Sequence, residues 1–309
     1  MRLLLLLLIW ILHLNALAQG CSDAGFCTLG AMRPNQPTLI NNQPRLLSAE
    51  ICFGKAATRF HDIIQNVNFD LNARISSTLS AQVKLPYMLV EGPLGKTAGF
   101  GDLSLSLSRK LFQNGGQSIG FTLGGKIPNG QPNRKSADDR PLPMYYQTTL
   151  GTYDIIAGLS YQNAHWLFAG GVQVPLNQAK SEFKWGAWKG DENEALARKY
   201  PVSAQIRRGS DWMLRLERNF RSSKWNGYLG LLSIYRFVPD RITLPATGAR
   251  TYVYNSNGLV INVITGFGFQ LTANQGIKLL AAYAPLKRKI NPDGLSRDWV
   301  LSMAYEYRF

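Results

Sequence analysis

Hydrophobic and polar residues alternate along much of the chain, most clearly in the last eleven residues. Odd-numbered positions from 299 to 309 are apolar or aromatic, and even-numbered positions are small or charged apart from Val300. Because a β-strand turns successive side chains to opposite faces, this segment has one apolar and one polar face. Such a strand suits the wall of a membrane β-barrel. Phe309, at the very end, is similar to the C-terminal insertion signal of bacterial outer-membrane proteins, which makes the barrel-insertion machinery an expected partner.

The same alternation recurs upstream and predicts about twelve strands. An even number of strands is typical of single-chain bacterial barrels. The register is hardest to assign in 225–238, which is apolar on both faces. The remaining predicted strands lie at 47–54, 67–71, 75–85, 99–112, 119–123, 155–161, 166–176, 212–217, 259–271 and 277–283.

The predicted connections between these strands alternate in length. Short polar connections lie at 113–116, 162–165, 221–224 and 273–276. Long connections with proline, glycine and charge lie at 86–98, 128–146, 180–200 and 239–256. Outer-membrane barrels have short periplasmic turns and long extracellular loops. The sequence therefore predicts an all-β fold, a transmembrane antiparallel β-barrel; a secreted β-sandwich is the alternative and does not explain the sorted loops.

The N-terminal segment predicts export. Arg2 is followed by an apolar run at 3–12 and a small-residue site that predicts cleavage after Ala18. The run is shorter than the roughly 20 residues that a spanning helix needs. We therefore expect a signal peptide at 1–18, an irregular extension at 19–45, and a barrel at 46–309 in the outer membrane of a Gram-negative bacterium. The proline-containing extension either plugs the lumen or hangs in the periplasm.

Three cysteines, Cys21, Cys27 and Cys52, would enter an oxidising compartment. A disulfide between Cys21 and Cys27 would close a small loop and leave Cys52 unpaired. Lipidation of Cys21 would instead leave Cys27 and Cys52 as the pair. Both arrangements are open from the sequence, and the first is the leading prediction.

The formal net charge of +15 raises the question of an anionic partner. We expect no nucleic-acid partner, because the basic residues concentrate in predicted extracellular loops. There they would face outer-membrane lipid and the phosphates of lipopolysaccharide, or would simply be solvated. These residues are Arg134, Lys135, Arg140, Lys180, Lys184, Lys189, Arg198, Lys199, Arg241, Arg250, Lys289 and Arg297.

Charges of both signs have the parity of the lumen face, where they can pair across the barrel. On the lipid face, Arg or Lys at the midplane would cost about 2–4 kcal/mol each. The lumen-facing structural candidates are Lys84, Asp102, Lys126, Asp154, Arg215 and Glu217.

The sequence offers little catalytic chemistry. His61 and His165 are the only histidines after the predicted cleavage site, and neither has a readable Ser/Asp arrangement around it. No phosphate loop, zinc motif or calcium loop is recognisable. We therefore expect no enzyme activity, no catalytic residue, no cofactor and no metal site.

Three motifs in residues 70–180 carry a family resemblance. They are Gly99-x-Gly101-Asp102, Lys126-x-Pro128-x-Gly130 and Gly151-Thr152-x-Asp154. In this order they resemble the outer-membrane barrel family associated with the phenol-degradation meta-pathway, distant relatives of the fatty-acid and toluene channels. The family's Pro-Thr-Gly is Pro-Asn-Gly here, and the fatty-acid channels' Asn-Pro-Ala signature is absent.

The resemblance implies a passive channel for small, hydrophobic or aromatic solutes. The alternative hypothesis is a structural or adhesive barrel with a closed lumen, whose basic loops bind lipopolysaccharide or a partner protein.

Overall fold

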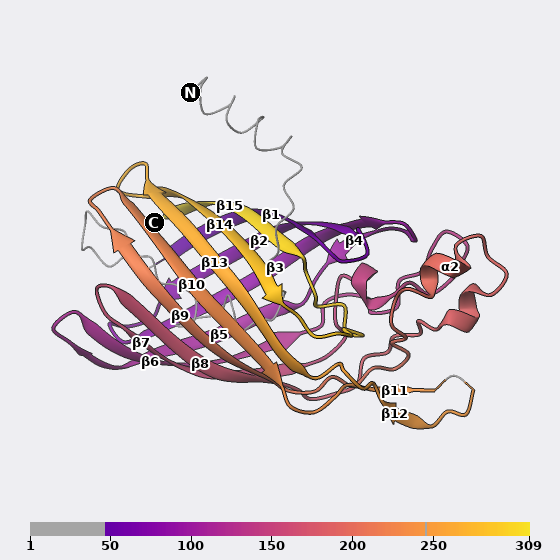
Figure 1. The fold of residues 1–309 in the computed structure, drawn as a ribbon. Helices are drawn as coiled ribbons and strands as arrows, with labels where there is room; N and C mark the ends of the chain where they lie inside the picture. Colours follow the sequence, from indigo (N-terminus) through magenta and orange to yellow (C-terminus); the bar gives the residue numbers. More distant parts are fainter. Residues whose placement is uncertain (1–46, 245) are drawn as a thin grey trace, which may run out of the picture.

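The computed structural model describes residues 47–244 and 246–309, which form a β-barrel with loops extending from one end (Figure 1). Alternating side chains build each wall strand, as the sequence predicts. The strands are β1 Leu47–Ala57, β2 Ile63–Arg74, β3 Leu79–Gly92, β4 Gly95–Phe100, β5 Leu103–Asn114, β6 Gln117–Ile127, β7 Asp154–Gln162, β8 Trp166–Pro175, β9 Asp211–Arg221, β10 Trp225–Arg236, β11 Arg241–Thr243, β12 Arg250–Tyr252, β13 Gly258–Gln270, β14 Gln275–Leu286 and β15 Trp299–Arg308.

The wall is a closed antiparallel sheet. Its order is β2-β1-β15-β14-β13-β10-β9-β8-β7-β6-β5-β3-β4, and pairing of β2 with β3 closes the ring. Because β4 and β5 pair with successive halves of β3, they act as one wall strand, which gives a twelve-strand barrel. The predicted fold class is therefore confirmed. The hairpin β11–β12 lies outside the wall.

One predicted connection is wrong, because residues 86–98 are mostly strand. They form the end of β3 and the start of β4, joined by a tight turn in which Gly92 opposes Gly95. Pro86 lies where β3 changes partner from β5 to β4, and its carbonyl accepts a hydrogen bond from Gly101 N at 2.8 Å. A proline is tolerated there because its missing N–H faces this break in the ladder.

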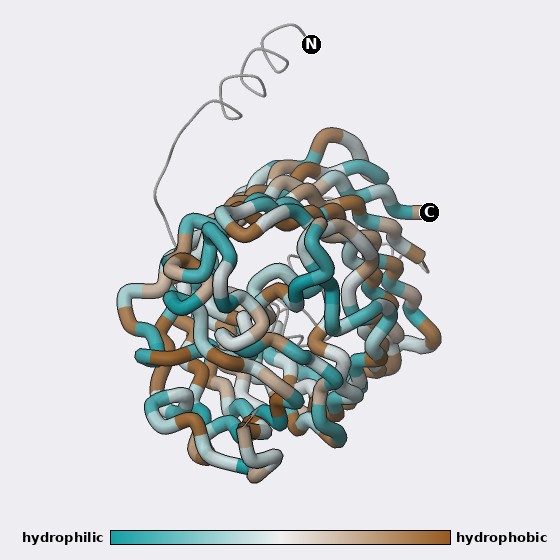
Figure 2. Tube along the Cα trace, turned by 90° about the vertical axis from the view of Figure 1, so that its right-hand side faces the viewer, coloured by the Kyte–Doolittle hydropathy of each residue, from teal (hydrophilic) through white to brown (hydrophobic). Residues whose placement is uncertain are grey.

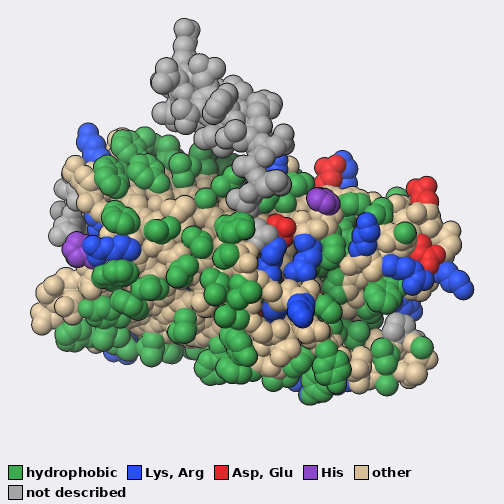
Figure 3. Space-filling view, viewed as in Figure 1, with side chains coloured by type: hydrophobic (Ala, Val, Ile, Leu, Met, Phe, Trp, Pro, Cys, Tyr) green, Lys and Arg blue, Asp and Glu red, His purple; other side chains and the backbone are tan. Residues whose placement is uncertain are grey.

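The wall has an apolar outer face. In β15, Tyr305 is exposed and the neighbouring Glu306 is buried, as the alternation predicts. Figure 3 shows hydrophobic side chains spread over the wall, with charged side chains toward its two ends. Seen from the loop end, strands alternate between hydrophobic and hydrophilic positions around the lumen (Figure 2).

Aromatic residues flank the apolar band. At the turn end, Trp166 stacks on Phe168 with ring centroids 6.1 Å apart, and Trp225 stacks on Phe267 at 6.2 Å. A second aromatic set, Trp212, Tyr235 and Phe237, lies at the loop end. Two girdles around an apolar wall are the pattern of outer-membrane barrels. This pattern agrees with the predicted location, the outer membrane of a Gram-negative bacterium.

The long loops contain three short helices: η3 Met144–Tyr146, η4 Trp185–Trp188 and α2 Glu194–Ala197. Among the described residues, no helix is long and apolar enough to span a membrane. The predicted signal peptide with Ala18, the extension 19–45, Cys21 and Cys27 lie outside the described residues. Cys52 lies in β1, where its side chain lines the lumen.

Candidate transport path through the barrel

The lumen encloses a cavity of about 200 Å³ between the polar wall strands and the loops above them. Tyr228 and Ile264, from β10 and β13, form an apolar side. Lys84 and Asp102, on the part of the wall around β3, form a charged side. The strand order places these two sides across the barrel from each other. The cavity therefore offers both apolar and polar contacts to a small molecule.

Two extracellular loops fold over this cavity. Met144 and Leu150 come from loop 128–153, Leu295 comes from loop 287–298, and the three form a buried apolar cluster that also lines the cavity. The loop backbones are in direct contact at Gly294, where φ is +68° and an added Cβ would lie 2.5 Å from the carbonyl carbon of Met144. This apolar contact covers the cavity at the loop end of the barrel.

Ion pairs hold loop 287–298 in place. Asp293 Oδ2 lies 2.9 Å from Arg236 Nη1, 3.4 Å from Arg288 Nη2 and 3.7 Å from Arg208 Nε. The side chains of Arg208, Arg236 and Asp293 are fully buried. The loop is therefore anchored to the β8–β9 connection and to β10 by charge that is shielded from water.

The same arginines bind three further carboxylates. Arg236 lies 2.7 Å from both Asp211 and Asp240, and Arg208 lies 2.9 Å from Asp154. Multiple partners for each guanidinium are what a buried charge needs to offset its desolvation.

This charge environment shifts the pKa of the loop groups. Burial alone would raise the pKa of Asp293, but Arg236, Arg288 and Arg208 hold it below its ordinary value. Burial likewise opposes the charge of Arg208, yet the carboxylate of Asp154 and its neighbours raise the Arg208 pKa above the ordinary value. Both groups are therefore ionised at neutral pH, and the anchor is a charged one.

Further ion pairs line the lumen. Lys126 Nζ lies 3.3 Å from Asp102, and Lys278 Nζ lies 2.7 Å from Glu50. Arg215 also pairs with Glu217. The sequence predicts charges of both signs on the lumen face, and here opposite charges pair inside the barrel.

All six predicted lumen residues lie on the interior side. Lys84, Asp102, Lys126 and Arg215 line the cavity. Asp154 and Glu217 are buried, and Asp154 belongs to the anchor of loop 287–298. Phe309 is exposed at the turn end, in edge contact with Tyr307 at 4.9 Å.

The sequence reasoning missed the anchor itself. Arg297, expected among solvated or lipid-facing loop charges, is buried and lines the cavity. Arg208, Arg288 and Asp293 lie in irregular segments, where no periodicity assigns a face. One signal was available, since Arg236 has the interior parity of β10, but that strand was the hardest to register.

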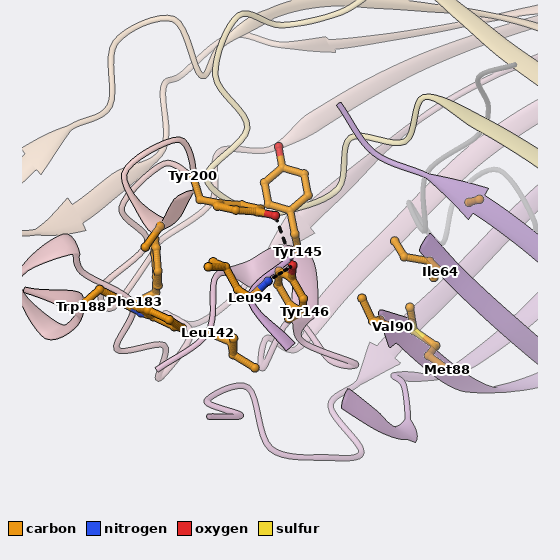
Figure 4. Close-up of a cluster of buried hydrophobic side chains, with 12 residues drawn as sticks. Ile64, Met88, Val90, Leu94, Leu142, Tyr145, Tyr146, Phe183, Trp188 and Tyr200 are labelled. Carbon is orange, nitrogen blue, oxygen red and sulfur yellow. Dashed lines mark hydrogen bonds between the residues drawn. The ribbon is translucent and has the colours of Figure 1, made fainter. Parts of the chain in front are cut away.

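An aromatic cluster supports the loops above the contact of Met144, Leu150 and Leu295 (Figure 4). Tyr200 donates a hydrogen bond to buried Asp62 Oδ1 at 2.6 Å, and its hydroxyl lies 3.2 Å from that of Tyr146. The Leu94 amide donates to Tyr146 Oη at 3.1 Å. The network joins loops 128–153 and 176–210 to the ends of β1–β4, so the extracellular cap is one packed unit.

Comparison with solved structures finds several proteins to which this chain is similar. The COG4313 outer membrane channel from Pseudomonas putida F1 has a TM-score of 0.62 and 14% identity, covering 90% of this chain and 99% of that one. The CymD monoaromatic hydrocarbon channel has a TM-score of 0.46 and 10% identity, covering 96% and 98%. The KdgM porin has a TM-score of 0.43 and 6% identity, covering 85% and 99%. No family model and no curated protein match the sequence.

Proposed function

We propose that this protein is a passive outer-membrane channel for small, hydrophobic or aromatic molecules. The observation that carries the proposal is the lumen cavity below the Met144–Leu150–Leu295 contact. Its apolar side, formed by Tyr228 and Ile264, suits a ring or short alkyl group. Ligand pockets are commonly lined by apolar groups with a few placed polar ones. The resemblance to phenol-degradation proteins supports this class of solute, and the fold shared with an outer membrane channel supports passage through the barrel.

No energy coupling is proposed. A solute would move down its concentration gradient past the apolar loop contact. Because Met144 and Leu295 form that contact through side chains, shortening both should widen the path without removing an ion pair. The double variant Met144→Ala/Leu295→Ala is therefore the sharpest probe of the path.

The experiment is solute uptake into liposomes that contain the purified protein, with a small aromatic hydrocarbon as the probe. We expect uptake above that of empty liposomes for the wild type and faster uptake for the double variant. Leu286→Ala, a truncation on the exposed outer face of β14, is the matched control and should leave uptake unchanged. Uptake equal to empty liposomes for both the wild type and the double variant would contradict a channel.

A structural or adhesive barrel is the second candidate. The observation in its favour is the filled extracellular half of the lumen, where the buried Arg208–Arg236–Asp293 network and the aromatic cap leave little open space. This role would be favoured if the double variant Met144→Ala/Leu295→Ala is as stable as the wild type but shows no solute uptake.

A further inference from the structure

Two arginines lie directly opposite each other outside the barrel wall. Arg207 N donates to Arg241 O at 2.8 Å, and Arg241 N donates to Arg207 O at 2.9 Å, which makes them a hydrogen-bonded antiparallel pair. Side chains at such positions project to the same face with Cβ atoms about 5 Å apart, and like charges there are destabilising. Both side chains are exposed. The arrangement therefore places two positive charges together, which lowers the stability of the folded protein.

The described residues supply no carboxylate to offset this repulsion. Arg241 donates to the Tyr252 hydroxyl and lies 4.4 Å from the centre of its ring, a contact that orients the guanidinium and leaves its charge in place. Arg207 forms no ion pair with any residue in the described part of the chain. The adjacent Arg208 points the other way, into the barrel, where its partners Asp154 and Asp211 are buried. Asp211, the acid nearest to Arg207 in sequence, is thus committed to the interior, as is Asp240, which precedes Arg241 and pairs with buried Arg236.

The two arginines border an open groove of about 450 Å³ on the outer surface. Most of its other lining residues are apolar, and they come from the loop ends of the wall strands and the residues next to them. Trp212 and Phe237 are more than half exposed and meet edge to face, with ring centroids 6.0 Å apart. The described groove residues include no acid.

The position of the groove indicates its depth in the membrane. Trp212 and Phe237 belong to the extracellular aromatic girdle, and such girdles lie at the level of lipid headgroups. Arg207 and Arg241 lie just beyond it, on the loop side. A molecule in the groove would therefore meet the arginines with its headgroup and the girdle with its apolar part.

We propose that this groove binds a phosphate of lipopolysaccharide in the outer leaflet. Arginine binds phosphate oxygens through two parallel N–H donors, and two opposed arginines can bind one phosphate from both sides. The phosphate would neutralise the repulsion between Arg207 and Arg241, while the first part of an acyl chain packs on Trp212 and Phe237. The site does not depend on what passes through the lumen, so a failure of the channel proposal would leave this proposal unaffected.

The binding test compares the full-length protein in detergent with lipid A and with dephosphorylated lipid A, by native mass spectrometry. We expect the wild type to retain lipid A at least about tenfold more tightly than the dephosphorylated form, since hydrogen bonds to charged groups are the strong ones. Arg207→Gln/Arg241→Gln should remove that preference. Arg207→Lys/Arg241→Lys, which keeps the charge but loses the planar donors, should retain only part of it.

Arg218→Gln is the matched control. Arg218 also lies beside exposed aromatic residues, 5.0 Å from the Trp166 ring, but at the turn end of the barrel, away from the lipopolysaccharide leaflet. This control should retain the full preference for lipid A. Equal binding of both lipids by the wild type, or equal loss in the control, would overturn the site. If inorganic phosphate displaces lipid A at the same concentration, the groove binds anions in general and the proposal of a lipopolysaccharide site is rejected.

A stability measurement covers the case in which the double variant fails to fold. In micelles without lipopolysaccharide, the single variant Arg207→Gln should unfold at a temperature equal to or above that of the wild type, because it relieves repulsion. Added lipid A should raise the unfolding temperature of the wild type more than that of Arg207→Gln. A variant that is less stable than the wild type without lipid, with an unchanged response to lipid A, would contradict the proposal.

Discussion

Arg236, at the end of β10, lies 2.9 Å from Asp293, which is 57 residues away in the loop before β15. Both side chains are fully buried, so the contact fixes loop 287–298 across the lumen with charge that water does not screen. The loop in turn supplies Leu295 to the apolar contact above the cavity. The position of Leu295 above the cavity therefore depends on an ion pair that lies beside it.

Replacing Asp293 with Asn should loosen the loop and increase permeation. The substitution keeps the size of the side chain but leaves Arg236, Arg288 and Arg208 with one carboxylate fewer. Removing one partner of a buried pair costs about 3–5 kcal/mol. We expect a lower unfolding temperature together with larger or more frequent single-channel openings in planar bilayers.

Asp298→Asn is the control in the same loop. Asp298 pairs with Lys287 at 2.9 Å, but both side chains are partly exposed. Exposed pairs contribute about 0–1 kcal/mol, so this variant should resemble the wild type in both measurements. Identical conductance for Asp293→Asn and the wild type would show that the anchor does not set the path width.

Mild acid should leave the anchor intact. The pKa of Asp293 is lower in the folded protein than in the unfolded chain, because Arg236, Arg288 and Arg208 outweigh its burial. Its contribution to stability is therefore present above the ordinary Asp pKa and is lost only as the pH falls through the lower, folded value. Conductance should therefore show no change that depends on Asp293 between pH 7 and about pH 4. Burial raises the pKa of Asp240, the other carboxylate on Arg236 Nη1, so a change that persists in Asp293→Asn belongs to Asp240. A wild-type channel that opens within this window, in a way that Asp293→Asn abolishes, would contradict the assignment.

The contact between the two loops can be tested at Gly294. Substitution with Ala costs about 1–2 kcal/mol for the left-handed backbone alone, and its Cβ would also meet the Met144 carbonyl carbon at 2.5 Å. Gly248→Ala is the matched control, since Gly248 has the same φ of +68° but open space around it. We expect Gly294→Ala to lose more stability in urea unfolding and to raise solute uptake, with uptake unchanged in Gly248→Ala. Equal effects of the two substitutions would show that the close contact at Gly294 does not hold the two loops together.

The barrel wall could be predicted from the sequence because each wall residue faces either lipid or lumen. Apolar and polar residues therefore alternate along each strand, and this alternation is visible in the sequence. Tyr305 and Glu306 are an example. The hairpin at 86–98 was misjudged because Pro86 usually argues against a strand, whereas here it lies at the change of partner between β5 and β4.

The anchor depends on contacts that no local pattern encodes. Arg208 and Asp293 meet only after two loops have folded over the same opening. Neighbours such as Arg207 and Arg208 are identical in type and opposite in environment, since one is exposed on the outer groove and the other is buried in the lumen. Composition and charge could therefore predict an ionic interior, but not which arginines belong to it.

The aromatic cap provides a final prediction, based on two tyrosines of similar burial. Tyr200 donates to the buried carboxylate of Asp62, whose other oxygen accepts a hydrogen bond from Thr58 at 2.8 Å. The Tyr145 hydroxyl is buried and has no hydrogen-bond partner in the described part of the chain. Tyr200→Phe should therefore cost about 1.5–3 kcal/mol, because it removes a hydrogen bond to a charged group. Tyr145→Phe should be neutral or slightly stabilising, since it removes an unsatisfied polar atom. Limited proteolysis of loop 176–210 and urea unfolding would measure both effects, and a Tyr200→Phe variant as resistant as Tyr145→Phe would show that packing alone holds the cap.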